Sequence, residues 1–149
     1  MRKMSVLLLE DRGAVSGPLT DVLVEKGFDV VSAFGVSDAQ TAWSQRNDKP
    51  IDCLIVDLNM SPHGLSEEEY RKTRSGLLTG WVWLANYVFI DEPKMKSRTI
   101  VFSDYLEDFI RVVDAQDREG VLLVSKRFES VEKLLRRLRE VEKSLEGKA

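Results

Sequence analysis

The sequence predicts an α/β fold, in which helices cover both faces of a doubly wound, five-stranded parallel sheet. Five short apolar runs, rich in β-branched residues, recur along the chain, and segments with a helical spacing of apolar residues separate them. The central runs barely alternate between apolar and polar residues, which is typical of strands that are buried on both faces. Strands that alternate with helices in this order indicate a parallel sheet with crossover helices.

The strands are predicted from the apolar runs at residues 6–10, 28–33, 51–57, 98–103 and 120–125. Helices are predicted at residues 14–26, 38–47, 105–116 and about 128–146, with a further helix before the fourth strand. In each helix the apolar residues lie three or four positions apart and so share one face. Gly27 ends the first helix. Ser37, with Gln40 three positions later, is a capping-box pattern near the start of the second.

The composition indicates a globular protein of one domain, which we expect to include all of residues 1–149. Hydrophobic residues make up 43% of the chain and charged residues 32%, so the chain is neither disordered nor fibrous. The formal net charge is -3, from 22 Lys and Arg residues against 25 Asp and Glu residues. A dedicated nucleic-acid binder usually has an excess of basic residues, so we expect no nucleic-acid partner.

The location of the protein is predicted from three features of the chain. Cys53 is the single cysteine, which excludes a disulfide within the chain and fits a reducing compartment. The first residues lack the long apolar region of a signal peptide. The apolar stretch at 76–90 is shorter than the ~20 residues that span a membrane as a helix. We therefore expect a soluble, cytoplasmic protein without a membrane partner.

Side chains that can bind ligands or react follow four of the predicted strands. In open α/β sheets, ligands bind at these carboxyl ends of the strands. The side chains are Glu10 and Asp11 after the first strand, Asp57 after the third, Ser103 at the end of the fourth and Lys126 after the fifth. Three carboxylates repel one another unless a cation joins them, and Mg²⁺ prefers such oxygen ligands. Lysine and serine suit phosphoryl oxygens, and a carboxylate can accept a phosphoryl group. These residues predict a Mg²⁺-dependent aspartyl-phosphate site.

With these residues the chain resembles, over nearly its whole length, the receiver domain of two-component response regulators, which is the chemotaxis-regulator-like family. The resemblance implies a flavodoxin-like receiver fold with strand order 2-1-3-4-5. It assigns the roles as follows: the acidic pair falls on Glu10 and Asp11, the phosphoacceptor on Asp57, the hydroxyl on Ser103, the lysine on Lys126, and the backbone carbonyl that also binds the metal on Asn59. The implied metal ligands are thus Glu10, Asp11, Asp57 and the Asn59 carbonyl, with Mg²⁺ as the cofactor.

The resemblance implies a signalling switch in a phosphorelay. A histidine kinase or a phosphotransfer protein would pass a phosphoryl group to Asp57, and a downstream protein partner would respond. We expect no enzyme, only a phosphoacceptor with at most weak self-dephosphorylation. A Mg²⁺-dependent phosphohydrolase would carry a second acid two residues after Asp57, where Asn59 stands. The alternative is a receiver-like adaptor that signals without phosphorylation. A homodimer, if formed, is expected to be symmetric.

The first departure from the family is an insertion between the third strand and the third helix, which we predict at about residues 61–79. The stretch from Asp57 to Ser103 exceeds a βαβ unit of roughly 30 residues by about 16. Gly64 and Gly80 are both candidates for the glycine at the start of the third helix, and Gly80 leaves a normal distance to Ser103. The insertion is either a lid or partner-reading element over Asp57 or a tolerated surface loop.

The third helix carries a second apolar stripe, Trp83, Tyr87 and Ile90, besides the stripe that faces the sheet. A helix that is apolar all round has to be covered on both sides. Either the insertion or a second subunit could cover this stripe. We favour the insertion, because it is adjacent and contains four large apolar residues, Leu65, Tyr70, Leu77 and Leu78.

The surroundings of the predicted switch also depart from the family. Leu123 stands where an aromatic residue is usual, Arg127 replaces a proline that is usually in a cis bond, and Asp104 replaces a small residue. A carboxylate at position 104 would repel a phosphoryl group. These differences leave Asp57 as the expected acceptor but motivate the adaptor alternative. His63, inside the insertion, is interpreted as an exposed loop residue.

Overall fold

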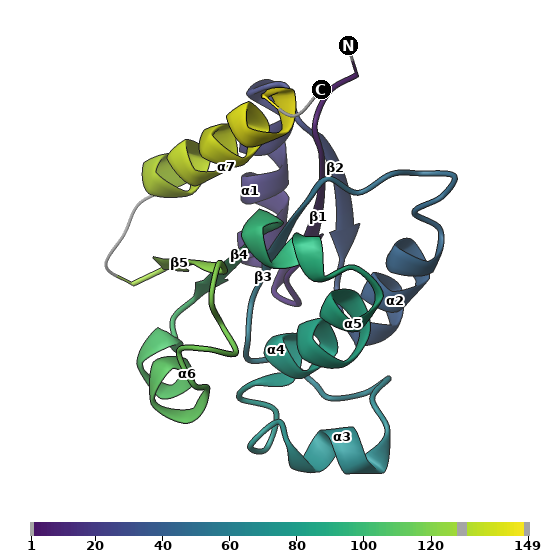
Figure 1. The fold of residues 1–149 in the computed structure, drawn as a ribbon, viewed down its shortest axis with the longest axis vertical. Coiled ribbons are helices and arrows are strands. Elements are labelled where there is room, and N and C mark those ends of the chain that lie inside the picture. Colours follow the sequence, from purple (N-terminus) through teal and green to yellow (C-terminus); the bar gives the residue numbers. More distant parts are fainter. Residues whose placement is uncertain (1, 128–130, 148–149) are drawn as a thin grey trace.

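Five parallel strands form one sheet, in the order β2-β1-β3-β4-β5, in a computed structural model that describes residues 2–127 and 131–147 (Figure 1). The strands are β1 (Ser5–Leu9), β2 (Asp29–Ala33), β3 (Cys53–Val56), β4 (Thr99–Ser103) and β5 (Leu122–Ser125). β1 and β3 have neighbours on both sides and are buried at every position, because helices cover both faces of the sheet. The predicted fold class and strand order are confirmed.

The helical elements are α1 (Gly13–Glu25), α2 (Val36–Ser44), α3 (Glu67–Arg71), α4 (Thr79–Trp83), the π-helix η1 (Leu84–Val88), α5 (Phe89–Asp91), the 3₁₀-helix η2 (Pro93–Arg98), α6 (Leu106–Val112) and α7 (Val131–Glu146). Two apolar cores result. On one face of the sheet, α1 and α7 pack through residues such as Leu23 and Leu138. On the other, α2, α4 and α6 pack through Trp43, Trp81 and Phe109 (Figure 1). None of the described helices has the length and apolar composition needed to span a membrane.

Three of the predicted helix boundaries are wrong, among them the end of α2, which falls at Ser44, three residues before the predicted end. α2 begins at Val36, two residues before the predicted start, and the predicted capping box does not form because Gly35 precedes the helix without a side-chain cap. The Gln40 side chain instead accepts a hydrogen bond from the Trp83 indole N–H at 2.9 Å. α6 ends at Val112, four residues before the predicted end. The predicted start of the last helix, at residues 128–130, lies outside the described residues.

The insertion leaves the sheet after β3 and contains the short helix α3. At the start of α3, Ser66 and Glu69 form a reciprocal capping box, with bonds of 3.1 and 2.8 Å. The third helix of the predicted fold is the continuous segment α4–η1–α5, which begins at Thr79. Gly80 is therefore the glycine at its start. A Cβ atom there would lie 2.0 Å from the Asp57 carbonyl oxygen, so this close approach requires glycine.

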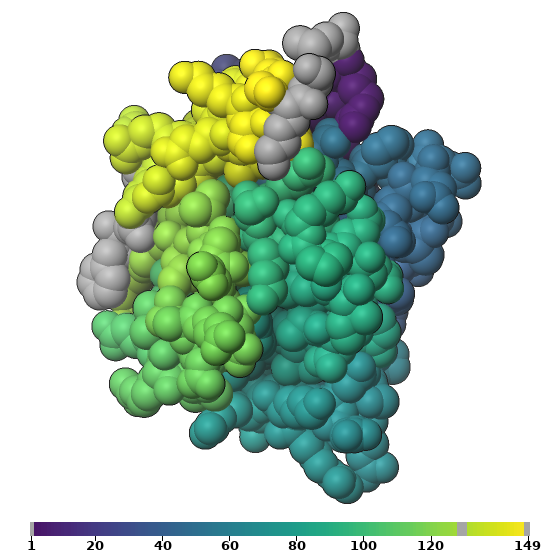
Figure 2. Space-filling view, in the orientation of Figure 1, coloured from purple at the N-terminus to yellow at the C-terminus, as the bar shows by residue number. Residues whose placement is uncertain are grey.

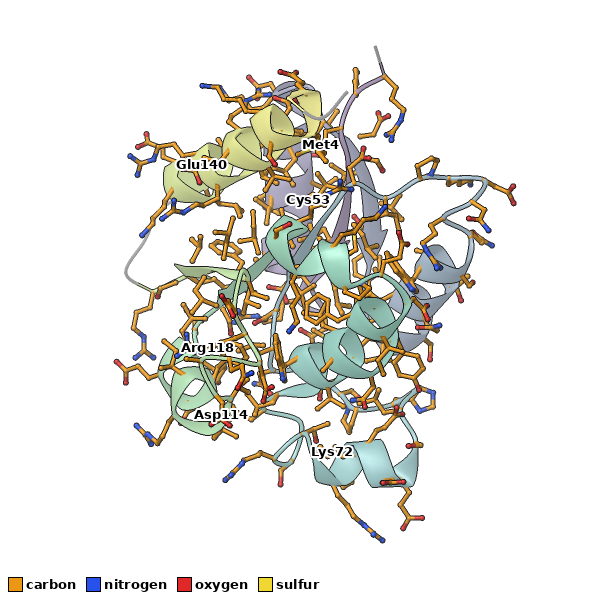
Figure 3. All side chains as sticks on the ribbon, viewed as in Figure 1. Met4, Cys53, Lys72, Asp114, Arg118 and Glu140 are labelled. Carbon is orange, nitrogen blue, oxygen red and sulfur yellow. The ribbon has the colours of Figure 1, made fainter. Side chains whose placement is uncertain are left out.

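The second apolar stripe is covered only in part. The Trp83 side chain is fully buried and its indole contacts α2, as described above. The Tyr87 hydroxyl donates to the Glu69 carboxylate in α3 at 2.9 Å, so the insertion does pack against this helix. Ile90 stays 68% exposed, and the prediction that the insertion covers the whole stripe is wrong. The insertion forms a tip at the end of the molecule opposite α7, as the positions of Lys72 and Glu140 also indicate (Figures 2 and 3).

Candidate functional site

Three carboxylates meet at the carboxyl edge of the sheet. Glu10 and Asp11 follow β1, and Asp57 follows β3, which is the neighbouring strand. One carboxylate oxygen of each lies within 4.8 Å of the others. Glu10 is 2% exposed and Asp57 6% exposed, whereas Asp11 is exposed. Two carboxylates of the cluster are therefore buried and the third lies at the surface, which leaves a route for a ligand from solvent.

A single cation joins the two buried carboxylates. The Lys126 ammonium, at the end of β5, donates to Asp57 Oδ2 at 2.9 Å and also contacts Glu10 Oε1. Its side chain is 9% exposed. Buried carboxylates need such a partner, because an unpaired charge at low dielectric costs several kcal/mol, on the order of 3 to 5. Sequence reasoning brought these three residues to one site, and the structure places them in contact.

The Asp57 carboxylate has partners for both oxygens. Its Oδ1 accepts a hydrogen bond from the backbone N–H of Leu58 at 2.8 Å, while Lys126 binds Oδ2. Burial raises the pKa of Asp57, and the Glu10 charge raises it further. The Lys126 charge and hydrogen bonds from Lys126 and Ser103 lower it, and the net pKa lies above the ordinary value for aspartate. A carboxylate held in this way is fixed in orientation.

Ser103 ends β4 and is fully buried beside this cluster. Its Oγ accepts a hydrogen bond from the backbone N–H of Tyr105 at 3.1 Å, so its hydroxyl hydrogen can point toward Asp57. Asn59 lies two residues after Asp57 and is exposed. Within the described part of the chain, no hydrogen bond to its carbonyl oxygen is present. All six residues predicted for the site thus gather around the ends of the strands.

The donor set fits a hard divalent cation. Mg²⁺ binds oxygen ligands and commonly uses one or two carboxylates together with several waters and phosphate oxygens. The carboxylates of Glu10, Asp11 and Asp57 exceed the one ammonium group of Lys126 in charge, so a cation would relieve their repulsion. Glu10, Asp11, Asp57 and the Asn59 carbonyl therefore suit Mg²⁺ by their chemistry.

Comparison with other proteins supports the fold. No family model matches the chain, and no curated protein matches it in sequence. Three similar structures are receiver domains. The non-phosphorylated HemR receiver domain from Leptospira biflexa is 18% identical, with a TM-score of 0.67 over 93% of this chain and 94% of that one. The receiver domain of the Francisella response regulator 1452 is 19% identical (TM-score 0.67, coverage 96% of this chain and 99% of that one), and a response regulator receiver domain from Clostridium thermocellum is 18% identical (TM-score 0.68, coverage 95% and 98%). The chain has the response regulator receiver fold.

The departures from a typical receiver domain are visible around the site. The Asp104 carboxylate has a charged partner, because its Oδ2 lies 3.8 Å from the Arg12 guanidinium. This ion pair offsets part of the charge that would repel a phosphoryl group. Leu123 is half-buried against the core that contains Trp81. No cis peptide bond occurs among the described residues, so Arg127 follows Lys126 in the trans form.

A groove in this receiver fold opens beside the carboxylate cluster. It has a volume of 410 Å³ and lies between α1 and the β4–β5 edge of the sheet. Apolar side chains of α1, including Val15 and Pro18, line one wall, and Arg12, Asp104 and Lys126 lie along it. The sequence contains no pattern that indicates this groove, because its walls come from segments that are distant in sequence.

Two further residues near the site were not singled out from the sequence. Thr79 and Gly76 contact the loop after Asp57, and Thr79 is fully buried. A threonine and a glycine in an unassigned insertion carry no pattern that indicates such contacts.

Proposed function

We propose that the protein is a response regulator receiver that accepts a phosphoryl group on Asp57 in the presence of Mg²⁺. The observation that carries this proposal is the buried Asp57 carboxylate, bound by Lys126 and grouped with Glu10 and Asp11. The receiver fold supports the same function. The phosphoryl donor would be a histidine kinase or phosphotransfer protein, and a downstream protein would bind the altered surface.

In the proposed step, an Asp57 carboxylate oxygen forms a bond to phosphorus while the bond from phosphorus to the donor nitrogen breaks. The bonding electron pair remains on that nitrogen. Lys126 would bind a phosphoryl oxygen in place of one of its present carboxylates, and the Ser103 hydroxyl would donate to another. Mg²⁺, held by Glu10, Asp11, Asp57 and the Asn59 carbonyl, would supply electrostatic stabilisation of the phosphoryl charge. Asn59 stands where a phosphohydrolase would carry a second acid. We therefore expect slow hydrolysis of the aspartyl phosphate rather than rapid multiple turnover.

The groove beside Lys126 provides a docking surface for the phosphodonor protein in this proposal. Its apolar wall on α1 would receive an amphipathic helix, and Lys126, which binds the Asp57 carboxylate, lies along the groove. The proposal also places the protein in the cytoplasm. Burial raises the pKa of the Cys53 thiol to about 12, so this residue stays protonated and unreactive there.

The proposal is tested by intact-mass measurement after incubation with a small acyl phosphate and Mg²⁺. We expect the wild type to gain one phosphoryl group and Asp57→Asn to gain none. Asp48→Asn, which changes an exposed carboxylate in the loop after α2, is the matched control and should react like the wild type. An adduct on Asp57→Asn, or none on the wild type, would overturn the proposal.

A receiver-like adaptor that signals without phosphorylation is the second candidate. Lys126 already pairs with Glu10 and Asp57 within the chain and offsets one of their two negative charges, and Asp104 adds a carboxylate to the rim of the site. A wild type that gains no phosphoryl group and does not respond to beryllofluoride with Mg²⁺ would favour the adaptor. Binding of beryllofluoride that is lost in Asp57→Asn would favour the phosphoacceptor.

A further inference from the structure

The end of the insertion holds the loop that follows Asp57. The backbone N–H of Met60 donates to the Gly76 carbonyl at 3.2 Å. The Thr79 hydroxyl lies 2.8 Å from the Met60 carbonyl oxygen and 2.9 Å from the Gly76 carbonyl oxygen, and its one proton is shared between them. Both backbone groups of Met60 are therefore bound by residues that lie some distance along the chain.

The same loop is also held on the other side of Asn59. The backbone N–H of Gly80 donates to the Leu58 carbonyl at 3.0 Å, and the Leu58 N–H donates to the Asp57 carboxylate. Among residues 58–60, the backbone groups of both neighbours of Asn59 are thus occupied. Of the backbone carbonyls of residues 58–60, that of Asn59 alone accepts no hydrogen bond from the described residues, and Asn59 stands two positions after Asp57 of the carboxylate cluster. A fixed carbonyl of this kind is a ready oxygen ligand for Mg²⁺.

The segment before Thr79 has a strained backbone. Arg74 and Ser75 have φ values of 55° and 60°, and Gly76 has a φ of 92°. Left-handed backbone at residues other than glycine is unfavourable and persists only where surrounding contacts enforce it. Here the fully buried Thr73 supplies such contacts. Its Oγ1 accepts from the Gly76 N–H at 3.0 Å, and its carbonyl accepts from the Leu78 N–H at 2.7 Å.

We propose that Thr79 and Gly76 form a clamp that positions the Asn59 carbonyl for Mg²⁺, with Thr79 as a positioning residue of the metal site. This inference rests on the proposed function, since it assumes that the carboxylate cluster binds Mg²⁺. The insertion then has a defined role: its strained turn presents one carbonyl and one hydroxyl to Met60. Neither residue touches the metal, and both act through the loop.

The clamp is tested by Mg²⁺ titration calorimetry on the wild type and three variants. Thr79→Val keeps the volume but removes the hydroxyl, and we expect its Mg²⁺ affinity to fall about tenfold, as for loss of other outer-shell partners. Thr79→Ser keeps the hydroxyl and should bind like the wild type. Ser66→Ala is the matched control, because it removes the cap of α3 elsewhere in the insertion and should leave Mg²⁺ affinity unchanged.

Phosphorylation provides a second measurement. We expect Thr79→Val to need about tenfold more Mg²⁺ for half-maximal phosphorylation but to reach the wild-type extent at saturation. If Thr79→Val fails to fold, Gly76→Ala disturbs the clamp from its other side, because its Cβ atom would lie 3.0 Å from the Met60 carbonyl oxygen. It should also weaken Mg²⁺ binding, and an affinity equal to that of the wild type would overturn the clamp.

The failure of the clamp differs from the failure of the proposed function. Wild-type protein that binds Mg²⁺ with the same affinity as Thr79→Val would overturn the clamp alone. Wild-type protein that binds no Mg²⁺ would overturn the metal site and the clamp together. Equal losses of Mg²⁺ affinity in Thr79→Val and Ser66→Ala would also overturn the clamp, because a general loosening of the insertion would then explain both losses.

Discussion

Two crossovers pack on the same face of the sheet, and they are held in different ways. The β3–β4 crossover, residues 57–98, is fixed by hydrogen bonds between side chains, among them the Trp43 indole to Asp91 at 3.0 Å and the Tyr87 hydroxyl to Glu69 at 2.9 Å. The β4–β5 crossover, residues 104–121, packs mainly through Phe109 and Val113. On its α6 helix, Ile110 is 47% exposed.

The difference indicates which side of the site is rigid. Directional hydrogen bonds fix the β3–β4 crossover, which begins at Asp57. The β4–β5 crossover follows Ser103, and its helix and the turn from Asp114 to Arg118 lie at the edge of the molecule (Figure 3). Segments with few buried contacts open at low free energy. We expect changes at Asp57 to be transmitted through the β4–β5 crossover, while the β3–β4 crossover keeps its geometry.

The largest expected effect is the loss of the anchor of α6. Phe109 is fully buried and meets Trp81 edge-on, with ring centroids 5.0 Å apart. Phe109→Ala should lower the free energy of unfolding by about 4 kcal/mol, measured by chemical denaturation. Phe34→Ala, at a residue that is 55% exposed, should change it by less than about 0.5 kcal/mol. Similar values for the two variants would mean that α6 does not depend on this anchor.

The next effect concerns the start of α4 in the rigid crossover. A Cβ atom on Gly80 would overlap the Asp57 carbonyl oxygen, which belongs to the backbone and cannot rotate away. Gly80→Ala should therefore cost about 3 kcal/mol of stability. Gly17→Ala is the control, because Gly17 lies within α1 with no atom close to its Cβ position, and it should stabilise by about 0.5 to 1 kcal/mol. A neutral Gly80→Ala variant would show that the crossover yields at this contact.

A smaller effect is expected at the outer end of the insertion. Ser66→Ala removes the side-chain cap of α3 and should cost about 1 kcal/mol of local stability, seen as faster hydrogen exchange in residues 66–72. Exchange in α4 should not change, because that helix has its own contacts. Ser144→Ala, at an exposed position in α7, serves as the control for serine replacement. Faster exchange throughout 61–91 would mean that the β3–β4 crossover unfolds as one unit.

The smallest effect is a pH dependence of the contact between α3 and η1. Burial raises the pKa of Glu69, but hydrogen bonds from Ser66 and Tyr87 outweigh it and hold the pKa below its ordinary value. A depressed pKa contributes stability above the unfolded value of 4.5, and this contribution is lost as the pH falls through the folded pKa. The hydrogen-exchange protection factors in α3, which are corrected for the pH dependence of intrinsic amide exchange, should therefore fall in acid, and Tyr87→Phe should reduce this acid dependence. An identical pH profile in Tyr87→Phe would contradict the role of its hydroxyl.

The sequence predicted the sheet, and the grouping of side chains at its carboxyl edge, because strands and their ends leave local patterns. The continuous apolar runs of β1 and β3 indicate buried strands, and parallel strands bring their carboxyl ends to one edge. The grouping of Glu10, Asp57 and Lys126 follows from that geometry alone. The required glycine at position 80 was also predictable, from the spacing to the fourth strand.

The remaining features depend on contacts between distant residues. α2 begins earlier than its capping pattern suggests, and Gln40 is used to bind Trp83 instead. Ile90 is apolar and in register with the second stripe, yet no part of the described chain covers it. The clamp on Met60 depends on the path of the insertion, which a periodicity of apolar residues does not encode.

The proposed function depends above all on the transfer of a phosphoryl group to Asp57 in the presence of Mg²⁺. Peptide mapping by mass spectrometry after reaction with an acyl phosphate tests it most directly. We predict that the phosphoryl group is found on the peptide that contains Asp57, and that it is absent when Mg²⁺ is chelated. A phosphoryl group on another peptide, or an Asp57 peptide that is never modified, would contradict the proposed function.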